Sequence, residues 1–150
     1  METKPVLASV LTPGMIHCVI VSYGIDQRDD PPGSALRIDT RSLRNPPEDP
    51  AVRERMLHSN GLNAEVRDYV LNTLGAMEIV ERAVDQTTAL LLADSLPGGD
   101  PMRRTDVHVA CGGGRHRSVA LAEEIGSQLR ELGVGVEVEH RHIGRPILTH

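Results

Sequence analysis

The stretch VHVACGGGRHRSVALAEEI, residues 107–125, begins as a β-strand and ends as an α-helix. Three glycines, two arginines, a histidine and a cysteine lie where the strand passes into the helix, in residues 111–117. Glycine adopts backbone dihedrals closed to other residues, so successive N–H groups can point into one concavity. The first turn of a helix adds unpaired N–H groups and a partial positive charge. The stretch therefore predicts a site for an anion at this junction.

Strand and helix patterns alternate along the rest of the chain. Short β-branched or alternating runs predict strands at 16–24, 35–43, 106–111 and 134–142. Apolar residues at helical spacing predict helices from Asn63 onward, divided near Gly75, and at 118–132, with Gly133 as the C-cap. Strands separated by helices imply right-handed crossovers. The expected fold class is α/β, a single three-layer domain with a small, mainly parallel sheet flanked by helices on both faces.

Outside these elements, two segments have no regular pattern. Residues 1–15 are expected to be a loose N-terminal leader, and residues 16–150 to be the α/β domain. Residues 44–50, RNPPEDP, are expected to be irregular because proline removes backbone donors and fixes φ. In parallel α/β sheets, ligands bind beyond the carboxyl ends of the strands, which is where the glycine-rich turn lies.

Composition narrows the classes of function. The net charge is −5, and the chain has no Phe or Trp and only two Tyr, Tyr23 and Tyr69. Aromatic platforms that stack nucleic-acid bases are therefore not expected. The two cysteines, Cys18 and Cys111, are too few for a disulfide framework. The sequence contains no pattern of a signal peptide and no apolar run of the ~20 residues that span a bilayer, so we expect a cytoplasmic protein with reduced thiols.

The glycine-rich turn fits the pattern C-x-x-G-x-x-R-S, the phosphate loop of cysteine-dependent phosphatases. Arginine matches the oxygens of a phosphate in bidentate fashion, and a histidine would add a further donor. The candidate phosphate-binding residues are Cys111, Gly112, Gly113, Gly114, Arg115, His116, Arg117 and Ser118. The pattern is neither a Walker A loop, which requires a lysine, nor the dinucleotide-binding G-x-G-x-x-G.

Two uses of this loop remain open at this point. It could hold a phosphate, or it could also cleave one. In a phosphatase, Cys111 would be the nucleophile, Arg117 the phosphate clamp and Asp100 the general acid. A third alternative is a module that interacts only with RNA or protein.

A longer segment resembles a known family. ACGGGRHRSVALAEEIGSQLRELGVGVEVEHRH, residues 110–142, is similar to the C-terminal domain of the RNase adapter protein RapZ family, in which C-[TS]-G-G-x-H-R-S-V opens a helix. RIDTRSLRNP (37–46) is similar to the family's F-D-V-R-F-L-x-N-P, and NGLNAEVRDYV (60–70) to its T-G-L-D segment. The resemblance covers roughly residues 17–145. The chain departs from it at Gly112, in place of a hydroxyl residue, and at Pro47-Glu48, where the family has His-Trp.

The resemblance implies an α/β domain that binds an amino-sugar phosphate, glucosamine-6-phosphate, and belongs to an oligomeric regulator acting on small RNA and protein partners. It implies binding rather than cleavage, without a cofactor. The cradle would be the loop residues named above, except Arg115. Asp39, Arg41 and Asn45 match the second motif and would lie near the ligand. We therefore expect a sensor or adapter domain. Like the regulator that it resembles, it should form a homo-oligomer, and no membrane partner is expected.

Two histidines near the end of the chain raise the question of a metal. His140 and His142 lie two apart on an expected strand and would share one face, as zinc ligands do. A third ligand at suitable spacing is missing, so no metal site is expected. His140, Arg141 and Arg145 are instead candidates for a basic rim around the cradle or for contacts with RNA phosphates.

Overall fold

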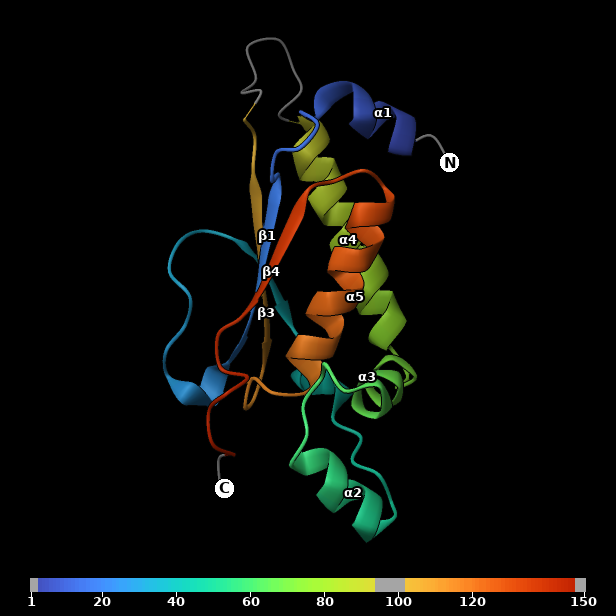
Figure 1. Cartoon of the computed structure of the whole chain (residues 1–150), viewed down its shortest axis with the longest axis vertical. Helices are drawn as coiled ribbons and strands as arrows, with labels where there is room; N and C mark the ends of the chain where they lie inside the picture. The colour runs from blue at the N-terminus through green and yellow to red at the C-terminus, as the bar shows by residue number, and fades with distance from the viewer. Residues whose placement is uncertain (1–2, 94–101, 148–150) are drawn as a thin grey trace.

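The computed structural model describes residues 3–93 and 102–147, and its centre is a parallel sheet (Figure 1). Its four strands run in the order β2-β3-β1-β4. They are β1 (Cys18–Gly24), β2 (Leu36–Asp39), β3 (Thr105–Cys111) and β4 (Val136–His140). Every pair of neighbouring strands is parallel. The expected α/β class with a parallel sheet is confirmed.

The helices follow the expected pattern from Asn63 onward. Asn63 caps α3 (Ala64–Leu71) by accepting hydrogen bonds from the amides of Glu65 and Val66. Gly75, at φ +91°, separates α3 from α4 (Ala76–Ala93). Helix α5 (Arg117–Glu131) follows β3, and Gly133 lies two residues beyond it at φ +91°. Short 3₁₀ turns, η1 (Ile25–Gln27) and η2 (Arg41–Leu43), follow β1 and β2.

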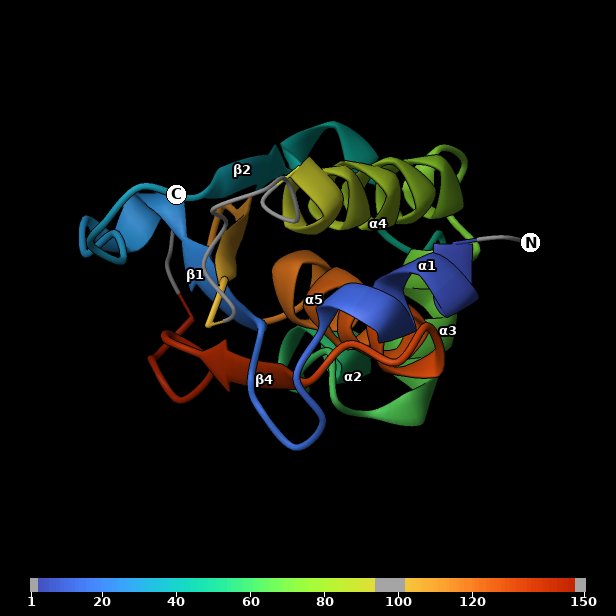
Figure 2. The ribbon, with the colours of Figure 1, turned by 90° about the horizontal axis from the view of Figure 1, so that it is seen from above.

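Two helices were not expected. Helix α1 (Thr3–Val10) lies within residues 1–15, which were expected to be a loose leader. That expectation is wrong, because Leu7 is fully buried and α1 packs against α4 (Figure 2). Helix α2 (Pro50–Leu57) begins at the last residue of the segment 44–50 that was expected to be irregular, because proline is tolerated in the first turn, and the Asp49 side chain accepts from the amide of Ala51.

The helices that contact the sheet lie on one face of it. Helix α4 packs against β2 and β3, and α5 against β1, β3 and β4 (Figures 1 and 2). The crossovers from β2 to β3 and from β3 to β4 step the same way across the sheet, so right-handed connections place both helices on the same side. The step from β1 to β2 goes the other way, and residues 25–35 accordingly run over the opposite face. The third layer is thus this irregular connection rather than the expected helices.

The core lies between the sheet and its helices. Because the chain has no Phe or Trp, aliphatic side chains fill it. Its fully buried members include Ile20, Val107 and Val109 on the strands and Leu121, Ile125 and Leu129 on α5. None of the helices in residues 3–93 and 102–147 is long and apolar enough to cross a membrane.

The register brings the carboxyl ends of three strands to one edge. Gly24 at the end of β1 pairs with Cys111 at the end of β3, and Asp39 at the end of β2 pairs with Ala110. The segments that follow these strands therefore converge, and the glycine-rich loop lies between them.

Candidate functional site

The glycine-rich loop folds around the Cys111 thiol. Its Sγ accepts a hydrogen bond from the Gly114 amide at 3.1 Å and lies 3.1 Å from Oγ of Ser118. Cys111 is 2% exposed and Ser118 is fully buried. The two side chains thus lie beneath the loop and join its two ends.

The loop needs glycine where it approaches β1. Gly114 has φ +82°, and a Cβ there would lie 2.6 Å from the amide nitrogen of Gly24. A Cβ on Gly24 would lie 2.4 Å from the carbonyl carbon of Gly113. The turn η1 holds the loop from the same side, since the Asp26 amide donates to the Gly112 carbonyl at 3.0 Å and Gln27 Nε2 to the Gly113 carbonyl at 3.2 Å.

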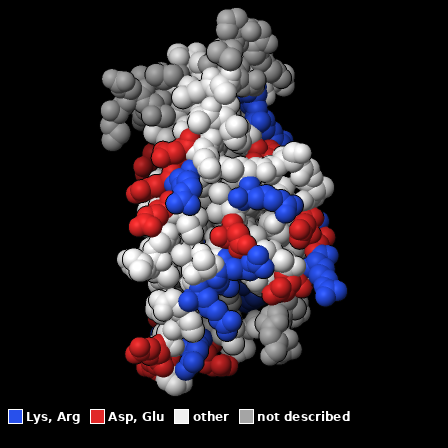
Figure 3. Space-filling model, turned by 180° about the vertical axis from the view of Figure 1, so that it is seen from behind, with Lys and Arg blue, Asp and Glu red and all other residues white. Residues whose placement is uncertain are grey.

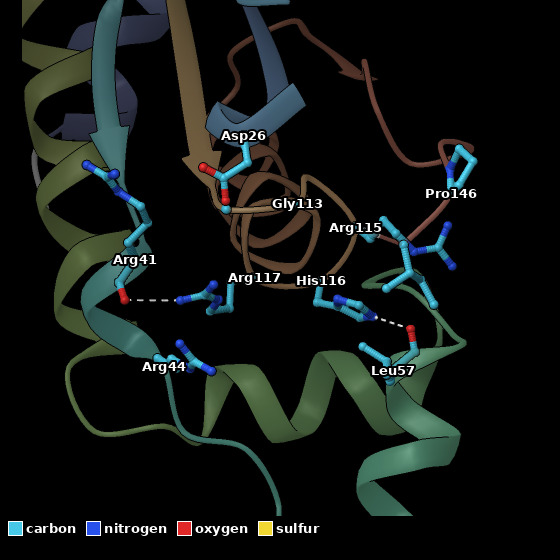
Figure 4. A pocket seen from close by; sticks show the side chains of 11 residues that line it. Asp26, Arg41, Arg44, Leu57, Gly113, Arg115, His116, Arg117 and Pro146 are labelled. Atoms are coloured by element: carbon cyan, nitrogen blue, oxygen red, sulfur yellow. Dashed lines mark hydrogen bonds between the residues drawn. The ribbon is translucent and has the colours of Figure 1, made fainter. Parts of the chain in front are cut away.

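A cavity of about 480 Å³ opens above this loop (Figure 4). Gly112 and Gly113 line it together with the start of α5, which begins at Arg117 without a side-chain cap. The cationic residues in its lining are Arg41, Arg44, Arg115 and Arg117. Cys111, Gly114 and Ser118 are not in the lining. The structure thus divides the eight predicted residues into five that face the cavity and three that support them.

Two arginines of the loop have different surroundings. Arg115 donates to the carbonyls of Ser59, Ile143 and Arg145 at 3.1, 3.0 and 2.9 Å, so it ties three segments together. Arg117 donates through one nitrogen to the carbonyl of Arg41 at 3.0 Å (Figure 4), while its other terminal nitrogen faces Gly112.

These acceptors are neutral carbonyls, so the hydrogen bonds do not pair either guanidinium with a carboxylate. Within residues 3–93 and 102–147, neither Arg115, Arg117 nor Arg44 forms an ion pair with a carboxylate. Three positive charges therefore face the cavity together with the uncapped end of α5, which favours an anion there.

His116 contributes no charge near neutral pH. Burial lowers the pKa of its imidazole, and its Nε2 donates to the Leu57 carbonyl at 3.2 Å. Figure 4 shows the ring turned toward Leu57, between the loop and the end of α2. His116 therefore anchors α2 to the loop as a neutral donor, whereas the sequence suggested a further donor to the ligand.

Asp26 gives the cavity one acidic wall. It follows β1, and its carboxylate lies beside Gly112, across from the arginine at position 117 (Figure 4). A carboxylate accepts hydrogen bonds from hydroxyl or ammonium groups and repels phosphate. The cavity thus has a cationic side and an acidic side.

Asp39, Arg41 and Asn45, which were expected near the ligand, do not all lie in the cavity. Arg41 lines the cavity with its backbone, because its guanidinium turns away to bind both oxygens of Asp39, with a closest distance of 2.7 Å. That ion pair lowers the pKa of the Asp39 carboxyl. Asn45 lies in an adjoining groove. Asp39 is therefore held away from the loop.

The histidines expected near the loop have structural partners. His140 Nδ1 lies 2.6 Å from Ser22 Oγ, and its Nε2 lies 2.8 Å from Glu123. His142 accepts from the Gly24 amide through Nδ1 at 2.8 Å, which places its proton on Nε2 toward Asp29. Among the described residues no three His, Cys, Asp or Glu side chains gather as metal ligands.

The arginines of the expected basic rim share one carboxylate. Arg141 and Arg145 both bind Asp29, at 2.9 and 3.0 Å. These contacts lower the pKa of Asp29, with the hydrogen bond from Arg141 as the largest cause. On the face shown in Figure 3, arginines and carboxylates likewise lie next to one another.

The remaining candidates are Asp100 and the thiols. Asp100, the candidate general acid, lies outside the described residues. Cys18 and Cys111 are both free and buried, at opposite ends of paired strands. Burial raises the pKa of Cys18 to about 12, so it is a neutral thiol.

Sequence reasoning missed several residues of the cavity. Asp26 and Arg44 could have been found, since each follows a predicted strand at the ligand-binding edge. Leu57, Pro146 and Ile147 carry no such signal, because only tertiary packing brings α2 and the segment after β4 to the loop.

Comparisons with known proteins give one family match and several curated relatives. The model of the RapZ C-terminal domain matches residues 16–144. A nucleotide-binding protein of Parafrankia sp. is 40% identical over 131 residues, which cover 87% of this chain and 42% of that protein. Nucleotide-binding proteins of Acidiphilium cryptum and Salinispora tropica are 37% and 35% identical, over 88% and 87% of this chain and 41% and 40% of theirs. The chain thus spans about two fifths of the length of these curated relatives.

Proposed function

The chain belongs to the RapZ C-terminal domain family, and on that premise we propose that it binds a small phosphorylated metabolite at the glycine-rich loop. Binding there would make it a regulatory sensor or adapter domain. The observation that carries the proposal is the cavity where Arg44, Arg115 and Arg117 meet the uncapped start of α5, none of the three forming an ion pair with a carboxylate of residues 3–93 and 102–147. Phosphate suits this site because guanidinium groups and helix amides both donate to its oxygens.

The Asp26 carboxylate indicates which chemical groups the rest of the ligand should carry. With the phosphate on the arginine side, hydroxyl or ammonium groups would face Asp26. An amino-sugar phosphate such as glucosamine-6-phosphate offers both kinds of group. It is therefore the first ligand to test for this site, and glucose-6-phosphate, which lacks the amine, is the comparison ligand.

A ligand panel tests the proposal. Melting temperature is measured with orthophosphate, sulfate, glucosamine-6-phosphate, glucose-6-phosphate and unphosphorylated glucosamine. Ligands that bind only the folded protein raise the melting temperature with concentration. We expect phosphate esters to raise it and glucosamine to leave it unchanged. A panel without any shift would overturn the proposal.

The same loop suits a cysteine-dependent phosphatase, and one observation favours that second candidate. Cys111 Sγ accepts from the Gly114 amide and contacts Ser118, two groups that would stabilise a thiolate. Against it, Cys111 is 2% exposed and does not line the cavity.

Cys111→Ser separates the two functions. We expect the variant to bind phosphate esters within about three-fold of the unmodified protein, because the thiol supports the loop from beneath. We also expect neither protein to hydrolyse p-nitrophenyl phosphate. Turnover by the unmodified protein that disappears in the variant would instead establish the phosphatase.

The pH dependence of binding tests the neutral state of His116. Its pKa is lowered, so the imidazole is neutral at pH 7 and gains charge only as the pH falls. A phosphate ester takes on its second charge near pH 6. Affinity measured by calorimetry is therefore expected to rise from pH 5.5 to 7.5 and to hold at pH 8. A fall in affinity above pH 6.5 that disappears in His116→Gln would show that a charged His116 binds the phosphate, and would contradict the neutral state.

A further inference from the structure

Asp29 binds three side chains of one turn. It lies in the connection between β1 and β2, and the turn, residues 141–145, follows β4. Its carboxylate accepts from Arg141 at 2.9 Å, from Arg145 at 3.0 Å and from Nε2 of His142 at 3.2 Å. The Asp29 carbonyl accepts a further bond from Arg141 at 2.8 Å. One residue on the opposite face of the sheet therefore holds this turn in place.

The same turn orients the guanidinium of Arg115. One terminal nitrogen of Arg115 donates to the carbonyls of Ile143 and Arg145, at 3.0 and 2.9 Å, and the other donates to Ser59. These bonds use only part of the guanidinium's donors, and its Nε is buried with no hydrogen-bond partner among the described residues. Figure 4 shows Arg115 on the same side of the cavity as Pro146, which follows the turn. Arg115 can therefore keep these carbonyls and also donate to a phosphate in the cavity that it lines.

His142 joins the turn to the loop at a second point. Its side chain is fully buried, and its Nδ1 accepts from the Gly24 amide at 2.8 Å. A Cβ at Gly114 would lie 2.9 Å from the His142 Cβ, so the turn packs directly against the glycine-rich loop. Because the Asp29 carboxylate accepts from Nε2, it stabilises the tautomer in which Nδ1 is free to accept. Asp29 thus supports the loop and Arg115 through the same turn.

From these contacts we propose that Asp29 is a positioning residue for the phosphate site. It fixes the turn 141–145, whose carbonyls set the place of the Arg115 guanidinium at the cavity wall. Asp29 does not line the cavity, so it acts through Arg115 rather than on the ligand. Supporting residues of this kind hold a binding group in its productive geometry. This inference rests on the proposed function, because Arg115 has a phosphate to hold only if the loop binds one.

The sign of the effect separates positioning from simple electrostatics. Removing the charge of Asp29 would by Coulomb attraction alone strengthen the binding of an anion nearby. We expect the opposite. Asp29→Asn keeps the size of the side chain and should bind phosphate esters about five-fold more weakly, which is part of the contribution of one hydrogen bond to a charged group. Asp30→Asn is the matched control, since it removes the same charge from an exposed neighbour. It should bind as tightly as the unmodified protein or more tightly.

A double-mutant cycle shows whether the effect passes through Arg115. Calorimetry measures the affinity for phosphate esters of Asp29→Asn, Arg115→Met and the double variant. We expect Asp29→Asn to cause no further loss in the Arg115→Met background, because substitutions within one network are not additive. NMR of the ligand-free protein gives a second readout. The Nε–H signal of Arg115 should shift or broaden in Asp29→Asn and stay unchanged in Asp30→Asn.

Three results would refute the positioning role and leave the phosphate site standing. They are an unchanged or higher affinity of Asp29→Asn, the same loss of affinity in the Arg115→Met background, and an unchanged Arg115 signal. A melting temperature of Asp29→Asn lowered by more than about 5 °C would show a general structural role and refute it as well. If the unmodified protein binds no ester, the proposed function fails and the positioning role fails with it.

Discussion

Replacing Arg117 by alanine is expected to weaken the binding of phosphate esters about 100-fold. Hydrogen bonds to charged groups contribute about 1.5–3 kcal/mol each, and a guanidinium offers a phosphate two parallel donors. Arg117 lines the cavity at the start of α5, with no ion pair among the described residues to compete for it. Calorimetry with the tightest ester of the panel measures the loss.

Two further variants separate the charge from the fold. Arg117→Lys keeps the charge but loses the planar fork, so it should recover only part of the affinity. Arg104→Ala is the matched control, because Arg104 pairs with Asp106 near the opposite end of β3. Its binding should be unchanged. If the Arg117→Ala variant bound phosphate esters as tightly as the Arg104→Ala control, the loop would not be the phosphate site.

Replacing Gly114 by alanine is expected to give the largest loss of stability among the loop positions. The residue has φ +82°, and its new Cβ would lie 2.6 Å from the Gly24 amide nitrogen and 2.9 Å from the His142 Cβ. Backbone strain and overpacking each cost about 1–3 kcal/mol. The expected loss in the free energy of unfolding is about 2–4 kcal/mol, which lowers the melting temperature by roughly 5–15 °C.

The neighbouring glycine is the matched control. A Cβ at Gly113 meets nothing within 4 Å, and its φ is not positive. The free energy of unfolding of Gly113→Ala should therefore lie within about 1 kcal/mol of that of the unmodified protein. Because Gly113 lines the cavity, the same variant reports on space for the ligand. Equal stability of the two variants would show that the loop does not depend on its contact with β1.

The strands, the later helices and the position of the glycine-rich loop at the carboxyl edge of the sheet could be predicted from short stretches of sequence. The Asn63 cap, the break at Gly75 and the strand-to-helix passage at residues 107–125 are set by neighbours within a few positions. Helix α1 was not predicted in this way; in the fold it packs against α4, and most helical stability in proteins comes from such tertiary packing. The single-sided helix layer likewise depends on strand order, which local patterns do not contain.

The sequence by itself determined the glycine loop and its phosphate-loop spacing, because both lie within one continuous stretch. It also determined the family of the chain, because each of the three segments that carry the resemblance can be compared residue by residue without the fold. Only the tertiary structure decided which side chains of the loop face the cavity and which are held by other parts of the chain. It assigns Arg115 to three carbonyls and His116 to Leu57, and it leaves Arg117 facing Gly112. The physical reason is that a side chain's role depends on the partners within its reach. Those partners, at residues 41, 57, 59, 143 and 145, come together only when the chain folds.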